Sequence, residues 1–153
     1  MRHFQKAFQI SSGLMLFATG LAKLLSVYGK SGVLDLLDPI TGLLFRHLLA
    51  LTGVLELTVA VVCLLFKPRL FVLFLIALLS SNFCIYRLGM WWIGWHKPCN
   101  CLGNFIDVLH IKPETADTAM KIILAYLLIG SYGSLFWLWR QRKKAAASAA
   151  VMQ

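Results

Sequence analysis

The chemically most suggestive feature of the sequence is a pair of cysteines, Cys99 and Cys101, separated by one residue. In extended backbone, residues two apart have their Cα atoms roughly 7 Å from one another, at the limit for an unstrained disulfide. Pro98, Asn100 and Gly103 favour a tight turn, which would bring the two thiols together. A disulfide in so small a loop would be strained, and strained, exposed disulfides exchange readily. The pair therefore predicts thiol–disulfide exchange.

The residues before the pair favour a reactive thiol. His96 and Lys97 supply positive charge, which promotes the thiolate form of a nearby cysteine. Two other interpretations stay open: an inert bridge or free thiols, and metal ligation with His96 and His110 as the obvious further ligands. An inert bridge across one residue closes almost no loop and would add little stability. We therefore favour a redox pair and predict no metal.

The two remaining cysteines fall within apolar stretches of the sequence. Cys84 is expected in the third stretch, near the end of that stretch closer to the pair. It is a candidate resolving thiol, and the alternative is a small buried apolar side chain. Cys63 is expected near the far end of the second stretch, where it would only pack against its neighbours.

Glu56 is the least expected residue of the chain, because it falls near the middle of an apolar stretch. In a membrane, an unpaired charge at that depth costs at least ~2.5 kcal/mol. Lys23 lies about four residues from the end of the preceding stretch. In two antiparallel helices, the lean of each side chain toward its own N-terminus would bring the two charged groups together. We predict that Lys23 and Glu56 pair inside the protein, as a structural clamp or in a proton relay.

The elements that must position these residues are four apolar stretches. Apolar residues make up 59% of the 153-residue chain and charged residues 14%, against usual values of ~45–50% and ~25%. Each stretch approaches the ~20 residues that an α-helix needs to cross a bilayer, and none alternates like a β-barrel strand. The predicted spans are about 8–28, 47–66, 69–88 and 118–139. The predicted fold class is all-α, an integral membrane four-helix bundle with an outward-facing Cys-x-Cys loop between the third and fourth helices.

The chain is expected to form a single transmembrane domain over residues 1–141, followed by a disordered cytoplasmic tail over 142–153. No small-x-small cleavage site follows the first span, which favours its retention over removal as a signal peptide. The sequences Asp38-Pro39 and Lys112-Pro113 predict helix starts. Close packing between helices is expected at five glycines: Gly13, Gly20, Gly53, Gly130 and Gly133.

The net charge of +9 indicates membrane topology rather than a nucleic-acid partner. One group of basic residues flanks the termini and the second loop with no acidic residue among them: Arg2, Lys6, Lys67, Arg69, Arg140, Arg142, Lys143 and Lys144. By the positive-inside rule this group marks the cytoplasmic face. Both termini are then cytoplasmic and the Cys-x-Cys loop is periplasmic. We expect a multi-pass protein of the bacterial inner membrane, surrounded by the lipid bilayer.

Three motifs together resemble the MauE/DoxX group of small four-helix membrane proteins. They are Gly20-Leu21-Ala22-Lys23-Leu24, Gly53-Val54-Leu55-Glu56 and Cys99-Asn100-Cys101-Leu102-Gly103. The resemblance extends over residues 12 to 139, and the third motif points to the MauE branch, although Leu102 replaces an aromatic residue that is common there. The resemblance implies a role in the maturation of exported, disulfide-containing proteins, which for the family's namesake is methylamine dehydrogenase. It also implies a thioredoxin-like partner.

These observations favour a membrane protein that exchanges disulfides with a periplasmic thioredoxin-like partner through Cys99 and Cys101, and so supports the maturation of an exported client. The alternative is a non-enzymatic membrane assembly factor, or a subunit of a respiratory or oxidase-type complex. Whether the protein is a thiol–disulfide oxidoreductase in its own right therefore stays open. We predict no bound cofactor; a quinone could accept the electrons, but the sequence reveals no site for one.

Overall fold

The computed structural model describes residues 2–29, 34–66, 70–94 and 113–151. Four helices make up most of this described part: α1 (Arg2–Val27), α2 (Phe45–Leu65), α3 (Leu70–Trp92) and α5 (Pro113–Val151). Each contains a segment long and apolar enough to cross a membrane: Gln5–Val27, Phe45–Leu65, Leu70–Trp92 and Asp117–Gln141. The all-helical class and the four membrane-spanning helices are thereby confirmed. The predicted Cys-x-Cys loop falls in residues 95–112, outside the described residues.

The two ends of α5 show what local sequence can and cannot predict. The helix begins at Pro113, the position at which the missing amide hydrogen of proline is harmless. At its other end the helix continues to Val151, through residues for which we expected disorder. That segment is rich in alanine, which has the highest helix propensity of all residues. The backbone therefore stays helical well beyond the membrane-spanning segment, which ends at Gln141.

The connection before α2 differs from the sequence prediction. A helix start at Pro39 is wrong, because α2 begins only at Phe45. The preceding residues form a tight turn in which Leu37 and Leu44 make an isolated antiparallel bridge. Gly42 in this turn has a φ of 68°, a left-handed conformation that glycine adopts without strain. The turn, rather than a helix, sets the position of Asp38 described below.

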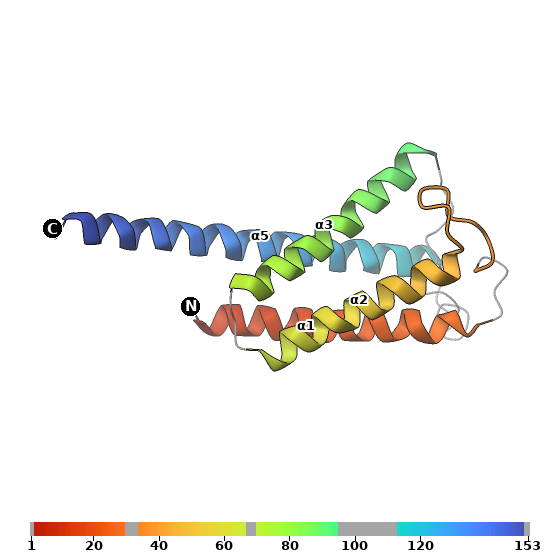
Figure 1. Ribbon diagram of the computed structural model, residues 1–153, viewed down its shortest axis with the longest axis horizontal. Coiled ribbons are helices and arrows are strands. Elements are labelled where there is room, and N and C mark those ends of the chain that lie inside the picture. Colours follow the sequence, from red (N-terminus) through yellow and green to blue (C-terminus); the bar gives the residue numbers. More distant parts are fainter. Residues whose placement is uncertain (1, 30–33, 67–69, 95–112, 152–153) are drawn as a thin grey trace.

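The helices associate in two pairs. α1 packs mainly against α2, and α3 packs mainly against α5. Figure 1 shows α1 and α2 running antiparallel, with the N-terminal end of α1 and the C-terminal end of α5 at the same end of the bundle. The last turn of α3 and the first turn of α5 lie at the opposite end, together with the end of α1 and the start of α2 (Figure 1). Residues 95–112 therefore connect two helix ends that lie at this second end.

Glycines allow α1 and α2 to approach closely. A Cβ added to Gly20 would lie 3.1 Å from the carbonyl oxygen of Gly53, and a Cβ added to Gly53 would lie 3.1 Å from the carbonyl oxygen of Gly20. Gly13 lies against Cys63 in the same way, and a Cβ on Gly130 would collide with a phenylalanine ring. Such contacts are typical of helix pairs in membranes. The prediction is wrong for Gly133, where an added Cβ would meet no described atom of another helix within 4 Å.

The core and the outer surface of the bundle are both apolar. Residues from all four helices form the buried cluster, which includes Phe8, Val59, Ile76 and Leu127. Large apolar side chains are also exposed along every helix, for example Leu14, Leu51, Leu78 and Ile129. An exposed surface of this composition suits contact with lipid acyl chains, because hydrocarbon imposes no cost on apolar side chains.

Candidate functional site

Two ionisable side chains are buried next to each other within the bundle. Lys23 of α1 donates a hydrogen bond from Nζ to Oε1 of Glu56 on α2, and their side chains are only 5% and 2% exposed. The same ammonium lies 4.7 Å from the centre of the Phe83 ring on α3, within the range of a cation–π interaction. The predicted pairing of these two residues inside the bundle is therefore confirmed.

The close approach of α1 and α2 explains why the two charged groups meet. Lys23 follows Gly20 by three positions, and Glu56 follows Gly53 by three positions. Residues three apart lie on the same face of a helix, so each charged side chain sits one turn from the glycine contact. Because the two backbones touch at these glycines, a lysine and a glutamate on this face can reach each other without bending either helix.

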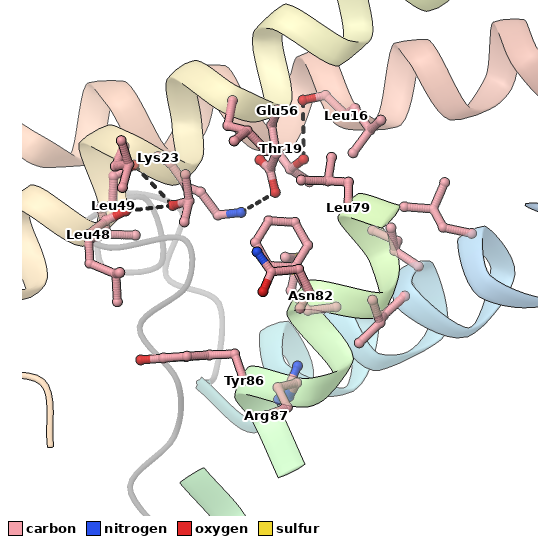
Figure 2. Close-up of a pocket in the computed structure, with 18 of the residues that line it drawn as sticks. Leu16, Thr19, Lys23, Leu48, Leu49, Glu56, Leu79, Asn82, Tyr86 and Arg87 are labelled. Atoms are coloured by element: carbon pink, nitrogen blue, oxygen red, sulfur yellow. Dashed lines mark hydrogen bonds and ion pairs between the residues drawn. The ribbon is translucent and has the colours of Figure 1, made fainter. Parts of the chain in front are cut away.

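A cavity of about 280 Å³ lies beside the ion pair. Its wall is mostly apolar and comes from all four helices, with leucines of α1, α2, α3 and α5 and the rings of Phe45 and Phe83. The polar residues that line it are Thr19, Lys23, Thr41, Thr52, Glu56, Asn82, Tyr86 and Arg87. Figure 2 shows Lys23 and Glu56 pointing toward one another, with Asn82, Tyr86 and Arg87 carried by α3. An apolar cavity with a few converging polar groups is the usual form of a small-molecule site.

One oxygen of the buried carboxylate lacks a donor. Oε1 of Glu56 accepts from Lys23, whereas no described atom donates a hydrogen bond to Oε2, which is fully buried. Thr19 lies next to Glu56 (Figure 2), but its hydroxyl donates to the carbonyl oxygens of Met15 and Leu16 on its own helix. A buried carboxylate oxygen without a donor is costly, because it has lost its hydration without replacement.

A second buried carboxylate, Asp38, stands at the edge of this region. It is 1% exposed, and its Oδ2 accepts from the amide and the hydroxyl of Thr41 at 2.8 and 2.5 Å. Oδ1 accepts from the hydroxyl of Tyr86 on α3 at 2.8 Å. Since Thr41 and Tyr86 both line the cavity, Asp38 fixes the turn before α2 against α3 and helps to define the cavity wall.

Arg87 connects the cavity wall to α5. Its guanidinium pairs with Oδ1 of Asp117 in the first part of that helix, and Lys121 lies 2.7 Å from Oδ2 of the same carboxylate. The side chains of Arg87 and Asp117 are 23% and 19% exposed, so the pair lies between surface and core. This contact holds α3 and α5 together next to the ligand-sized cavity.

The sequence alone did not identify four residues as parts of one site: Asp38, Asn82, Tyr86 and Arg87. A signal for the α3 residues is nevertheless present, because Leu79, Asn82, Phe83, Tyr86 and Arg87 follow the spacing i, i+3, i+4, i+7, i+8 of a single helix face. No comparable signal exists for Asp38. Its partner on α3 is 48 residues away, and only the three-dimensional fold brings the two together.

The predicted redox residues are only partly within the described structure. Cys99, Cys101, His96 and Lys97 lie outside the described residues. Cys84 is in the second half of α3, partly buried and without a disulfide, and it does not line the cavity although its neighbour Phe83 does. Cys63 is 1% exposed and belongs to the apolar core, as expected for a packing residue.

Four membrane-spanning helices around a buried ion pair define the class of the protein, a multi-pass helical membrane protein. The chain belongs to the family of the methylamine utilisation protein MauE, whose family model matches residues 1–140. This confirms the family resemblance carried by the sequence motifs and makes the chain a methylamine-utilisation-related membrane protein. Neither a curated protein nor a solved structure matches the chain.

Proposed function

We propose that the protein exchanges disulfides with a thioredoxin-like partner outside the cytoplasm through Cys99 and Cys101, and that this supports the maturation of exported, disulfide-containing proteins. The observation that carries the proposal is the Cys-x-Cys sequence in the connection between α3 and α5 of a MauE-family membrane protein. In this position the pair belongs to the long connection of the bundle, and functional residues are concentrated in such connections.

The distribution of charge supports a periplasmic position for this connection. The bundle end with both chain termini carries basic residues and no acidic ones in its flanking sequence: Arg2, Lys6, Arg140, Arg142, Lys143 and Lys144. The opposite end contains Asp35, Asp38 and Asp117. Under the positive-inside rule the termini are cytoplasmic. The connection that contains the pair then faces the periplasm, an oxidising compartment in which disulfides persist.

The exchange itself needs only the two thiols and the partner's disulfide. One thiol of the pair loses its proton, and its thiolate attacks a sulfur of the partner's disulfide. The partner's S–S bond breaks, its other sulfur leaves as a thiolate and takes up a proton, and a mixed disulfide joins the two proteins. The second thiolate of the pair then attacks its neighbour's sulfur and releases the partner as a dithiol. Two electrons have moved to the partner, and the reverse sequence oxidises it.

Three further residues, His96, Lys97 and Cys84, would take part in this exchange. The positive charge of Lys97, and of His96 when protonated, would favour the attacking thiolate. Cys84 would act after the exchange, as a thiol that could receive the disulfide from the pair, because it is the described cysteine nearer in sequence to the pair and is only partly buried.

Trapping the mixed disulfide tests the proposal. In membranes from cells that express a Cys101→Ser variant, the partner attached to Cys99 cannot be released by the second thiol. We expect a reductant-sensitive adduct on a non-reducing gel, and mass spectrometry should identify a thioredoxin-like protein in it. The Cys99→Ser/Cys101→Ser double variant is the matched control and should form no adduct. An adduct that persists in the double variant, or normal oxidation of exported clients with it, would contradict the proposal.

A further inference from the structure

The cavity beside Lys23 and Glu56 has the properties of a binding site for a neutral, lipid-soluble molecule. Its lining residues other than Thr41 belong to the membrane-spanning segments, and half of its wall is leucine and phenylalanine. A charged ligand of either sign is disfavoured. A cation would compete with the ammonium of Lys23, and an anion would face the Glu56 carboxylate. A ligand that enters from the bilayer must therefore be apolar over most of its surface.

The hydrogen-bonding groups of the cavity specify what polar group such a ligand needs. The hydroxyls of Thr19 and Thr52 donate to backbone carbonyls of their own helices, and those of Thr41 and Tyr86 donate to Asp38. These four hydroxyls are therefore engaged, and the guanidinium of Arg87 pairs with Asp117. The amide of Asn82 is a further polar group in the cavity wall. Oε2 of Glu56 is a buried acceptor to which no described atom donates a hydrogen bond, on a side chain that is 2% exposed. The matching ligand group is a hydrogen-bond donor without charge, such as a hydroxyl.

We propose that this cavity binds a lipid-soluble phenol, with its ring between the apolar side chains and its hydroxyl donating to Oε2 of Glu56. An aromatic ring fits the available space, since a cavity of ~150 Å³ already holds benzene and this one measures about 280 Å³. The rings of Phe45 and Phe83 in the wall offer favourable contacts to another ring. Membrane hydroquinones belong to this chemical class. The binding is separate from thiol exchange and does not depend on it.

Thermal unfolding of the full chain in detergent micelles tests the binding with two probes that differ by one hydroxyl, 4-propylphenol and propylbenzene. A ligand that binds only the folded state raises the unfolding midpoint. We expect 4-propylphenol to raise it saturably, by about 5 °C or more at a hundredfold excess over its Kd, and propylbenzene to have a much smaller effect. Both probes partition into micelles, so the comparison between them removes the general solvent effect.

Two tryptophan substitutions on α5 localise the response. Leu124→Trp would fill the cavity that Leu124 lines and should abolish the shift. Ile129→Trp is the matched control, because Ile129 is 75% exposed on the same helix, and it should leave the shift intact. Equal shifts with both probes, no shift with 4-propylphenol, or an undiminished shift in folded Leu124→Trp would each overturn the proposal. The comparison of probes on the unmodified protein decides even if Leu124→Trp fails to fold.

Discussion

At the scale of single residues, the paired charges of Lys23 and Glu56 have the largest expected effect on stability. Burying two charges is expensive, and their mutual attraction offsets that cost only while both are present. Lys23→Met should therefore lower the free energy of unfolding by about 3–5 kcal/mol, because it leaves a buried carboxylate alone. The double variant Lys23→Met/Glu56→Met should recover most of this loss. Denaturant unfolding in micelles measures both.

The exposed pair of Arg46 and Asp35 supplies the control for this prediction. Its side chains are 38% and 69% exposed, so Asp35→Ala should change the free energy of unfolding by less than about 1 kcal/mol. If the double methionine variant is no more stable than Lys23→Met, the loss of packing, rather than the unpaired charge, explains the instability.

The hydrogen bond from Tyr86 to Asp38 permits a matched test with two tyrosines. Tyr86→Phe removes one donor from a buried carboxylate and should cost about 1.5–3 kcal/mol of unfolding free energy. Tyr132→Phe removes the same atom from a side chain that is 54% exposed and bonded to Ser81, and it should cost less than about 1 kcal/mol. Thermal denaturation of the two variants provides the comparison; equal losses would show that Asp38 does not depend on Tyr86.

The same residues show how far sequence could predict the site. Glu56 and Lys23 were found because a charge inside an apolar stretch must have a partner, and helix geometry indicates which one. Asp38 was misread as a helix cap, because the Asp-Pro dipeptide fits a helix start equally well. Its contacts with Tyr86 and Thr41 depend on the path of the turn before α2. That Oε2 of Glu56 lacks a hydrogen-bond donor could not be recognised before the positions of its neighbours were known.

At the scale of helices, the glycine contact between α1 and α2 controls the separation of the pair. Gly20→Val should force the two helices apart, since even a Cβ there lies 3.1 Å from the Gly53 carbonyl oxygen. Overpacking of this kind typically costs 1–3 kcal/mol, so we expect a loss of about that size in thermal or denaturant unfolding. Gly133→Val makes the same change on α5, where a Cβ would meet no described atom within 4 Å outside its own stretch of helix, and should be nearly neutral. Equal destabilisation of both variants would contradict the close-contact role of Gly20.

Helix positions were largely predictable, because hydrophobic length alone identifies a membrane-spanning helix. The predicted spans fall within or close to the observed helices, and proline correctly placed the start of α5. Errors arose where hydrophobicity carries no information. The alanine-rich end of α5 continues the helix beyond the membrane-spanning segment, so hydrophobic length does not predict it. The position of Gly133 relative to other helices follows from packing that a sequence pattern does not contain.

At the scale of the whole molecule, the orientation of the bundle is directly measurable. In a variant with all four native cysteines replaced by alanine, a single cysteine can be introduced at either end. Tyr28, at the end of α1, is 86% exposed, and Lys143, near the other end of the bundle, is exposed as well. An impermeant maleimide added to intact spheroplasts should label Tyr28→Cys, and should label Lys143→Cys only after permeabilisation. The reverse pattern would place the Cys-x-Cys connection in the cytoplasm and contradict the proposed exchange.

The charge pair also has a consequence for how the protein enters the membrane. Glu56 falls midway along α2, where an isolated ionised carboxylate costs roughly 2.5–3.5 kcal/mol in the translocon scale. Ribosomes deliver α1 first, so Lys23 is already available when α2 leaves the insertion machinery. The two segments are therefore best transferred to lipid as one hairpin rather than singly. We therefore expect membrane insertion, and not only the stability of the finished bundle, to depend on Lys23 and Glu56.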